Sequence, residues 1–137
     1  MRLTRTLIIA LLMLAGVAQA AEEGTIPAEA KPLIGEALRA VVAGKTWRYE
    51  IAKPGNPYRG QEMEIAYATD GTFRGRNATI GGEDDGRWKI DQDKLCTLWT
   101  HWAPIMVCSR VLEVNGALIR VDPGTGTKVV WVIKEIK

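Results

Sequence analysis

The stretch GRWKIDQDKLCTLWTHW, residues 86–102, decides how this chain folds. It holds three of the five tryptophans, the only histidine (His101) and one of the two cysteines (Cys96). At its start the apolar residues Trp88 and Ile90 alternate with charged residues, and a period of two is typical of a β-strand with one buried face. We therefore interpret the stretch as a core strand, a turn and the beginning of a second strand, rather than as an active site.

The same alternation occurs earlier in the chain, in WRYEI at 47–51 and EMEIAYA at 62–68. Asp70-Gly71 and Asn115-Gly116 suit type I′ hairpin turns, which need positive φ at both central residues. The remaining breaks between strands fall at 53–57, 81–86 and 122–126. Seven or eight strands joined by short turns predict a small antiparallel up-and-down β-barrel of the lipocalin or avidin type, with a β-sandwich as the alternative.

One N-terminal helix is expected before the strands, over residues 32–43. Its apolar residues recur at helical spacing, as in Leu38, Val41 and Val42. Pro32 suits a first helical turn, and Gly44 suits the position just after a helix end.

Cys96 and Cys108 are the only cysteines, and an even count in an exported chain predicts a disulfide. If the two residues lie directly opposite each other in a hairpin, Thr97 faces Val107 and the tip falls at 101–103. The distance between directly opposed residues of an antiparallel pair is within disulfide reach.

This hairpin is apolar on both faces, so it needs cover on both sides. Because the helix has an apolar stripe and no other partner, we expect Leu38 and Val41 to pack on the outside of the hairpin, near Trp99 and Val107. Trp99 is then a packing residue under the helix.

The first twenty residues have the pattern of a secretory signal peptide. Arg2 and Arg5 precede an apolar run at 7–17, and Ala18-Gln19-Ala20 is a small-x-small cleavage site. We expect cleavage after Ala20, a flexible mature N-terminus at 21–31 and a single domain at 32–137. The run is too short to span a membrane, so the mature protein is expected to be exported to the periplasm or beyond without a membrane span.

Charge argues against a nucleic-acid partner. The chain has 18 basic and 16 acidic residues, and loss of residues 1–20 removes only Arg2 and Arg5, which leaves 16 of each. Nucleic-acid binding needs a dense basic surface, and here the basic residues are scattered.

Motifs for catalysis and metal binding are incomplete. His101 with the two cysteines contains zinc-ligand residue types, but the spacing matches no common zinc pattern. Ser109 lies outside any G-x-S-x-G elbow, and GKT at 44–46 lacks the upstream glycine of a phosphate loop. The acidic clusters at 83–85 and 91–93 are interpreted as turn residues. We expect no enzyme activity, metal or cofactor.

Aromatic residues fall on the inward-facing positions of the predicted strands. These residues are Trp47, Tyr49, Tyr67, Phe73 and Trp88. They either fill a small barrel or line a ligand cavity inside it.

Four segments carry a resemblance: GKTW at 44–47, YATDGTFRG at 67–75, GRWKIDQDKLCTLW at 86–99 and Val-Cys at 107–108. The chain resembles a family of small exported alphaproteobacterial proteins of unknown function. That resemblance implies a β-barrel-like fold and no catalytic residues. The Gly-Arg-Trp-Lys-Ile strand with one disulfide also resembles exported bacterial metalloprotease inhibitors, in which an N-terminal arm enters the protease.

These observations predict an exported, non-catalytic binding protein. Its partner is expected to be a small apolar ligand or another envelope protein. The alternatives are an inhibitor of a secreted or envelope hydrolase, which could use 22–31 or the loop KPGNPYRG at 53–60, and an enzyme of unknown type.

Overall fold

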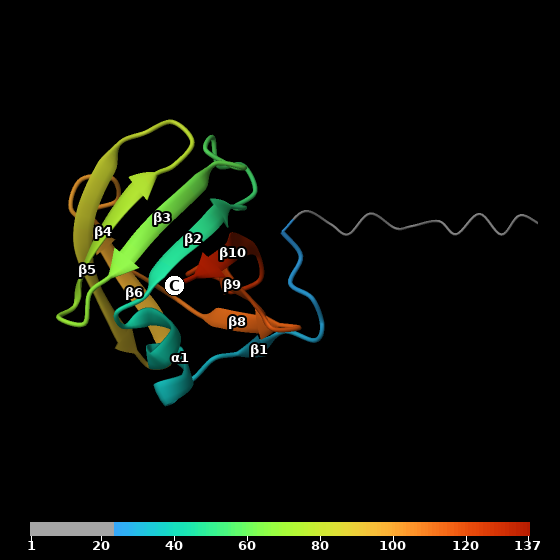
Figure 1. Cartoon of the computed structure of the whole chain (residues 1–137). Coiled ribbons are helices and arrows are strands. Elements are labelled where there is room, and N and C mark those ends of the chain that lie inside the picture. Colours follow the sequence, from blue (N-terminus) through green and yellow to red (C-terminus); the bar gives the residue numbers. More distant parts are fainter. Residues whose placement is uncertain (1–23) are drawn as a thin grey trace, which may run out of the picture.

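The computed structural model describes residues 24–137, so the expected signal peptide and the cleavage site after Ala20 lie outside the described residues. Within that range the chain forms ten antiparallel strands and one helix (Figure 1). In chain order the elements are β1 (Lys31–Pro32), α1 (Gly35–Val42), β2 (Thr46–Ile51), β3 (Glu62–Tyr67), β4 (Thr72–Asn77), β5 (Glu83–Asp91), β6 (Lys94–Trp99), β7 (Val107–Ser109), β8 (Val111–Val114), β9 (Ala117–Val121) and β10 (Val129–Ile136).

The strands belong to one curled sheet with the order β1-β8-β9-β10-β2-β3-β4-β5-β6-β7. β7 is the last strand of this ladder and β8 the second, yet only Arg110 separates them in the chain. The backbone N–H of Val121 donates to the carbonyl of Arg110 at 3.2 Å. The sheet therefore curls so that the chain passes directly from β7, at one end of the sheet, to β8 near the other, and the fold is β-barrel-like.

The predicted mainly β, antiparallel architecture with one helix is confirmed. The alternating segments at 47–51, 62–68 and 88–91 fall in β2, β3 and β5. The sheet has ten strands rather than seven or eight, because residues 31–32 form an additional edge strand and Arg110 divides the expected strand after Cys108 into two.

One of the two predicted type I′ turns is observed. At Asp70-Gly71 the prediction is wrong, because Gly71 has positive φ (88°) and Asp70 does not. Asn115 (φ 51°) and Gly116 (φ 82°) both adopt positive φ between β8 and β9, as a type I′ turn requires. The expected break at 81–86 ends earlier than predicted, since β5 begins at Glu83. Asp84 and Asp85 are therefore strand residues, not turn residues.

Helix α1 is shorter than predicted, because Pro32 pairs with Leu112 in the sheet. Gly44 follows the helix end with φ 71°, as expected. The buried helix residues, Leu38 and Val42, are fully shielded from solvent and belong to the main core cluster. No helix among residues 24–137 has the length and apolarity that a membrane crossing requires.

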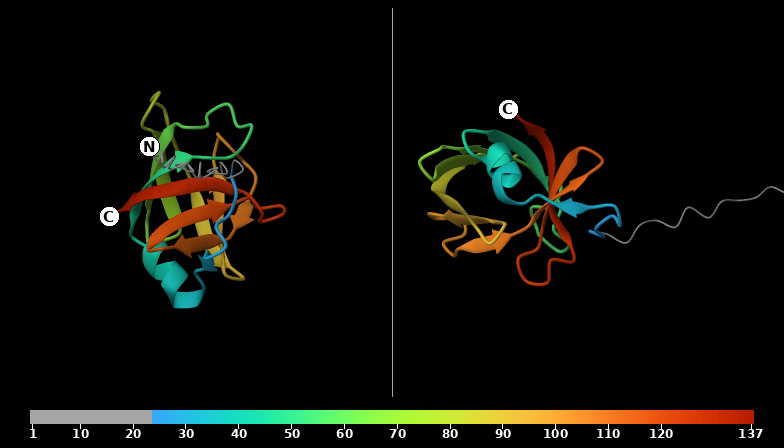
Figure 2. Two further views of the ribbon diagram at one scale, coloured as in Figure 1. Left: turned by 90° about the vertical axis from the view of Figure 1, so that its right-hand side faces the viewer. Right: turned by 90° about the horizontal axis from the view of Figure 1, so that it is seen from below.

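The predicted position of α1 on the outside of the disulfide hairpin is wrong. The indole N–H of Trp47 donates to the carbonyl of Val41 at 2.7 Å, and the Arg39 guanidinium lies 5.7 Å from the ring centroid of Trp88. Figure 2, in its right-hand view, shows α1 across one end of the curled sheet. The apolar stripe of the helix is thus buried in the same core cluster as the inward-facing aromatic rings.

The disulfide and its register are confirmed. Cys96 and Cys108 are bonded and directly paired across β6 and β7, and Thr97 pairs with Val107. The face assigned to Trp99 is wrong, however: its side chain points into the curled sheet and is only 8% exposed. A Cβ on Gly75 would lie 2.4 Å from the Trp99 ring, so this glycine on β4 leaves the space that the indole occupies.

Residues 24–32, expected to belong mostly to a flexible terminus, lie along the sheet. Thr25 forms a bridge with Lys128, and β1 pairs with β8. Ile26 and Ala30 pack on a second, aliphatic cluster. The buried members of that cluster are Leu112, Ile119, Val121 and Val129. The N-terminal segment thus covers the outer side of β8, β9 and β10.

Candidate functional site

A pocket of about 520 Å³ lies at the end of the curled sheet away from α1. Loops between β2 and β3, β4 and β5, and β6 and β7 contribute to it, and Figure 1 shows the first two of these loops at the end opposite the helix. The aromatic lining residues are Tyr49, Tyr58, Trp99, Trp102 and Trp131. The aliphatic ones are Ile51, Met63, Ile80, Ala103 and Val130. The lining is thus mainly apolar, which is usual for ligand sites.

Exposed apolar side chains concentrate around this pocket. Within residues 24–137 the structure exposes six large hydrophobic side chains, and three of them line the pocket: Tyr58 (51% exposed), Ile80 (63%) and Trp102 (44%). Ile105 and Met106 lie in the same loop as Trp102. Scattered exposed apolar residues are normal, whereas exposed apolar residues grouped at one pocket are typical of binding surfaces.

Stacked rings form the pocket wall. Tyr49 and Trp131 stack with their centroids 3.9 Å apart, and Trp99 lies 5.0 Å from Trp102. Trp99 in turn meets the edge of Phe73 at 4.7 Å. Because these rings support one another, the wall presents flat aromatic surfaces in fixed positions.

Asp84 holds the loop that carries Trp102. Its carboxylate accepts hydrogen bonds from the backbone N–H groups of His101 (2.9 Å) and Trp102 (2.8 Å), and it lies 3.0 Å from His101 Nδ1. Burial alone would raise the pKa of Asp84, but these hydrogen bonds outweigh it and hold the pKa at about 2. The carboxylate therefore stays ionised and fixes the start of the β6–β7 loop over the pocket.

Arg120 on β9 lies behind the pocket wall and is 2% exposed. It donates to Ser109 Oγ (2.6 Å), Thr97 Oγ1 (3.2 Å) and the carbonyl of Leu95 (2.8 Å), so it connects β9 to β6 and β7. Its guanidinium lies 4.4 Å from the ring centroid of Trp131. Burial lowers the pKa of Arg120, and none of its hydrogen-bond partners is a carboxylate.

The five aromatic side chains considered for a cavity lining are all buried, and they fall into two places. Tyr49 lies in the wall of the pocket. The other three pack around Tyr67: the ring centroids of Trp47, Trp88 and Phe73 lie 5.3, 6.0 and 6.1 Å from that of Tyr67. The interior near α1 is thus filled with rings.

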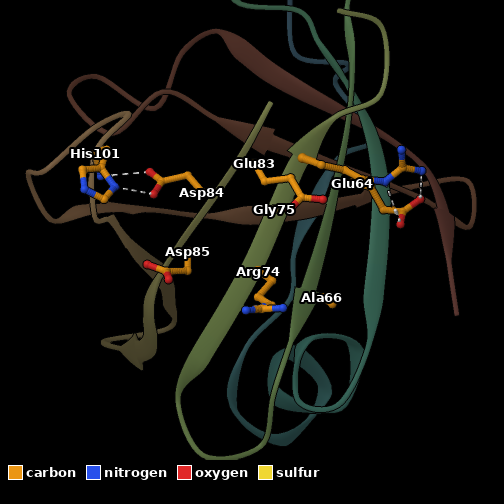
Figure 3. A pocket seen from close by; sticks show the side chains of 9 residues that line it. Glu64, Ala66, Arg74, Gly75, Glu83, Asp84, Asp85 and His101 are labelled. Carbon is orange, nitrogen blue, oxygen red and sulfur yellow. Dashed lines mark hydrogen bonds and ion pairs between the residues drawn. The ribbon is translucent and has the colours of Figure 1, made fainter. Parts of the chain in front are cut away.

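A second, polar groove of about 350 Å³ lies on the outer face of β3, β4 and β5 (Figure 3). Glu64 pairs there with Arg76 at 3.3 Å, and Arg74 lies opposite Asp85 in the strand register. The side chain of His101 at its edge is 81% exposed. Charges of both signs alternate across these strands, so the groove is a solvated strand surface.

The groups considered for catalysis do not form a nucleophile and base pair. Ser109 is 3% exposed and hydrogen-bonded to Arg120, and both cysteines are in the disulfide. Asp84 orients His101, but no serine or thiol of the described chain completes that pair. In residues 24–137 no three His, Cys, Asp or Glu side chains are grouped so that they could hold a metal ion.

The roles of Asp84 and Arg120 were not predicted from the sequence, in which Asp84 was interpreted as a turn residue. Both carried a signal: Asp84 has the same strand parity as the buried Trp88, and Arg120 that of the buried Leu118. A charged residue at an inward-facing position needs hydrogen-bond partners inside the fold.

Comparisons of the chain with protein-family models, with curated proteins and with solved structures found no match. The resemblances inferred from short motifs therefore remain predictions.

Proposed function

We propose that this protein is an exported, non-catalytic binding protein that takes a small apolar molecule into the pocket at the open end of its sheet. The observation that carries the proposal is the pocket itself. Its rings are held in place by stacking, and its rim exposes Tyr58, Ile80 and Trp102 to solvent. Keeping such side chains exposed is unfavourable in water, and a bound apolar molecule would cover them.

We also propose that the curled sheet functions as a small up-and-down barrel, comparable in architecture to lipocalins and avidins. If β7 and β8 are counted as one strand bent at Arg110, and β1 as an addition to the edge, eight strands remain. Eight strands enclose a space that side chains fill or that holds one small ligand.

Export to the periplasm or the extracellular space is part of the proposal. The disulfide supports it, since such bonds persist in oxidising compartments. The signal-peptide pattern of residues 1–20 supports it independently.

Binding of the fluorescent neutral probe N-phenyl-1-naphthylamine tests the proposal. We expect its fluorescence to rise on addition of the protein, and Ile80→Ser to weaken binding about fivefold, because loss of an apolar contact at the rim removes on the order of 1 kcal/mol. Ile34→Ser is the matched control, since Ile34 is 57% exposed and precedes α1 at the other end.

If the probe does not bind, or if Ile80→Ser and Ile34→Ser lower its affinity equally, the pocket is not the binding site and the proposal is contradicted. Native mass spectrometry of the protein purified from its own cell envelope would then show whether it retains a protein partner instead.

An inhibitor of a secreted or envelope hydrolase is less well supported. That function needs a free arm or loop. Thr25 instead forms a bridge with Lys128, residues 31–32 pair with β8, and the 53–60 loop forms part of the pocket rim.

A further inference from the structure

The lining of the open-end pocket carries charge of one sign only. Among its fifteen lining residues Lys53 is the only charged one, and the lining includes no carboxylate. Asp84 is the carboxylate that holds the adjoining loop, but it is not among the lining residues and its oxygens accept from His101 and Trp102. The lining itself therefore contributes only positive charge.

A second positive charge, that of Arg120, lies behind the Trp131 side chain of the pocket wall. Trp131 lines the pocket, and the Arg120 guanidinium lies 4.4 Å from the centroid of that ring. The hydrogen-bond acceptors of Arg120 are hydroxyl and carbonyl oxygens, namely those of Ser109, Thr97, Leu95 and Val107. Neutral acceptors satisfy the N–H groups but leave the charge in place, and salt screens a buried charge much less than an exposed one.

We infer that the pocket takes an amphiphile whose apolar body lies on the tryptophan wall and whose head group is anionic. This inference rests on the proposed function, because it specifies the ligand of the same pocket. The apolar body contacts Trp99, Trp102 and Trp131, and the head group lies at the rim beside Lys53. The charge of Arg120 acts in the same direction as that of Lys53, so both favour an anion and disfavour a cation.

Two ligands with the same tail and head groups of opposite charge test this charge preference separately from apolar binding. Dodecanoate and dodecylammonium, both below their micelle concentrations, would compete with bound N-phenyl-1-naphthylamine in low-salt buffer at pH 7. We expect dodecanoate to displace the probe at a concentration up to about fivefold lower than dodecylammonium does. One partly exposed charge pair contributes a free energy of about that size. Added salt should narrow the difference, since it screens the exposed Lys53.

Two lysine variants locate the head group. Lys53→Gln should raise the concentration of dodecanoate needed for displacement about two- to fivefold, whereas the concentration of dodecylammonium needed should not rise. Lys45→Gln is the matched control, because Lys45 is also exposed but lies at the start of β2, at the α1 end. This control should leave both ligands unaffected.

The outcomes separate the two proposals. If the neutral probe does not bind at all, the proposed function fails. If the probe binds but dodecylammonium displaces it as well as dodecanoate does, or if Lys53→Gln and Lys45→Gln behave alike, the pocket is apolar without a charge preference and this inference is overturned.

Discussion

The two ends of the curled sheet differ in how they are covered, although the same strands form both. At one end α1 covers the opening and buries Leu38 and Val42 completely. At the other end the loops leave Ile80 and Trp102 exposed around a pocket. One short helix thus makes the two ends different: the helix end buries apolar side chains in the core, whereas the loop end leaves apolar side chains exposed around a pocket.

The largest expected effect lies at the helix end. Leu38→Ala should lower the free energy of unfolding by about 2–5 kcal/mol, because it leaves a cavity among rings that cannot collapse into it. Ile34→Ala, at an exposed position just before the helix, should change stability little. Urea denaturation of both variants checks this, and equal stability of the two would mean that α1 does not close the sheet.

A smaller effect is expected from the disulfide, which joins β6 and β7 below the pocket loop. Replacing both Cys96 and Cys108 by alanine should lower the free energy of unfolding by about 2–3 kcal/mol, since the unfolded chain regains the freedom of a short closed loop. Denaturation curves with and without reductant measure this. Thiol labelling of the native wild-type protein should find no free thiol, and ready labelling of both cysteines would contradict the bond.

A still smaller effect is expected at Asp84, whose carboxylate binds the backbone of the pocket loop at His101 and Trp102. Its pKa is about 2 in the folded protein against an ordinary 3.8. The stabilisation is therefore present above about pH 4 and is lost as the pH falls through about 2. Asp84→Asn should cost about 1–2 kcal/mol at pH 7 and flatten the acid limb of the stability profile.

His101→Ala is the control for Asp84, because the imidazole is mostly exposed while the two backbone N–H groups still bind the carboxylate. It should change stability by less than about 0.5 kcal/mol. If His101→Ala matches Asp84→Asn, the imidazole rather than the backbone bonds carries the interaction.

Sequence periodicity was sufficient for the strands and for the disulfide register. Alternation identified β2, β3 and most of β5, and two cysteines were enough to align Thr97 with Val107. Periodicity was not sufficient for the orientation of β6. That strand is apolar on both faces, so alternation does not show which face points inward. The choice depends on Gly75, which is two strands away in the sheet and leaves space for the Trp99 ring.

The candidate site was less accessible from the sequence than the fold. Tyr49 was predicted to face inward. The pocket also contains loop residues such as Tyr58, Ile80 and Trp102, and no sequence periodicity identifies loop residues. The position of the helix could not be predicted either. An apolar stripe shows that the helix packs on some surface, but it does not identify that surface. Tertiary packing decides that, through the fit of Leu38 among the rings.

The outermost strands of the sheet have a consequence for the protein in concentrated solution. β1 has two residues and β7 has three, and β7 continues directly into β8 through Arg110. Long unpaired edges recruit strands from other copies of a chain and start edge-to-edge aggregation. Edges this short provide few free backbone donors and acceptors for such recruitment, so a protein rich in β-structure can remain dispersed while its loop end stays apolar and accessible.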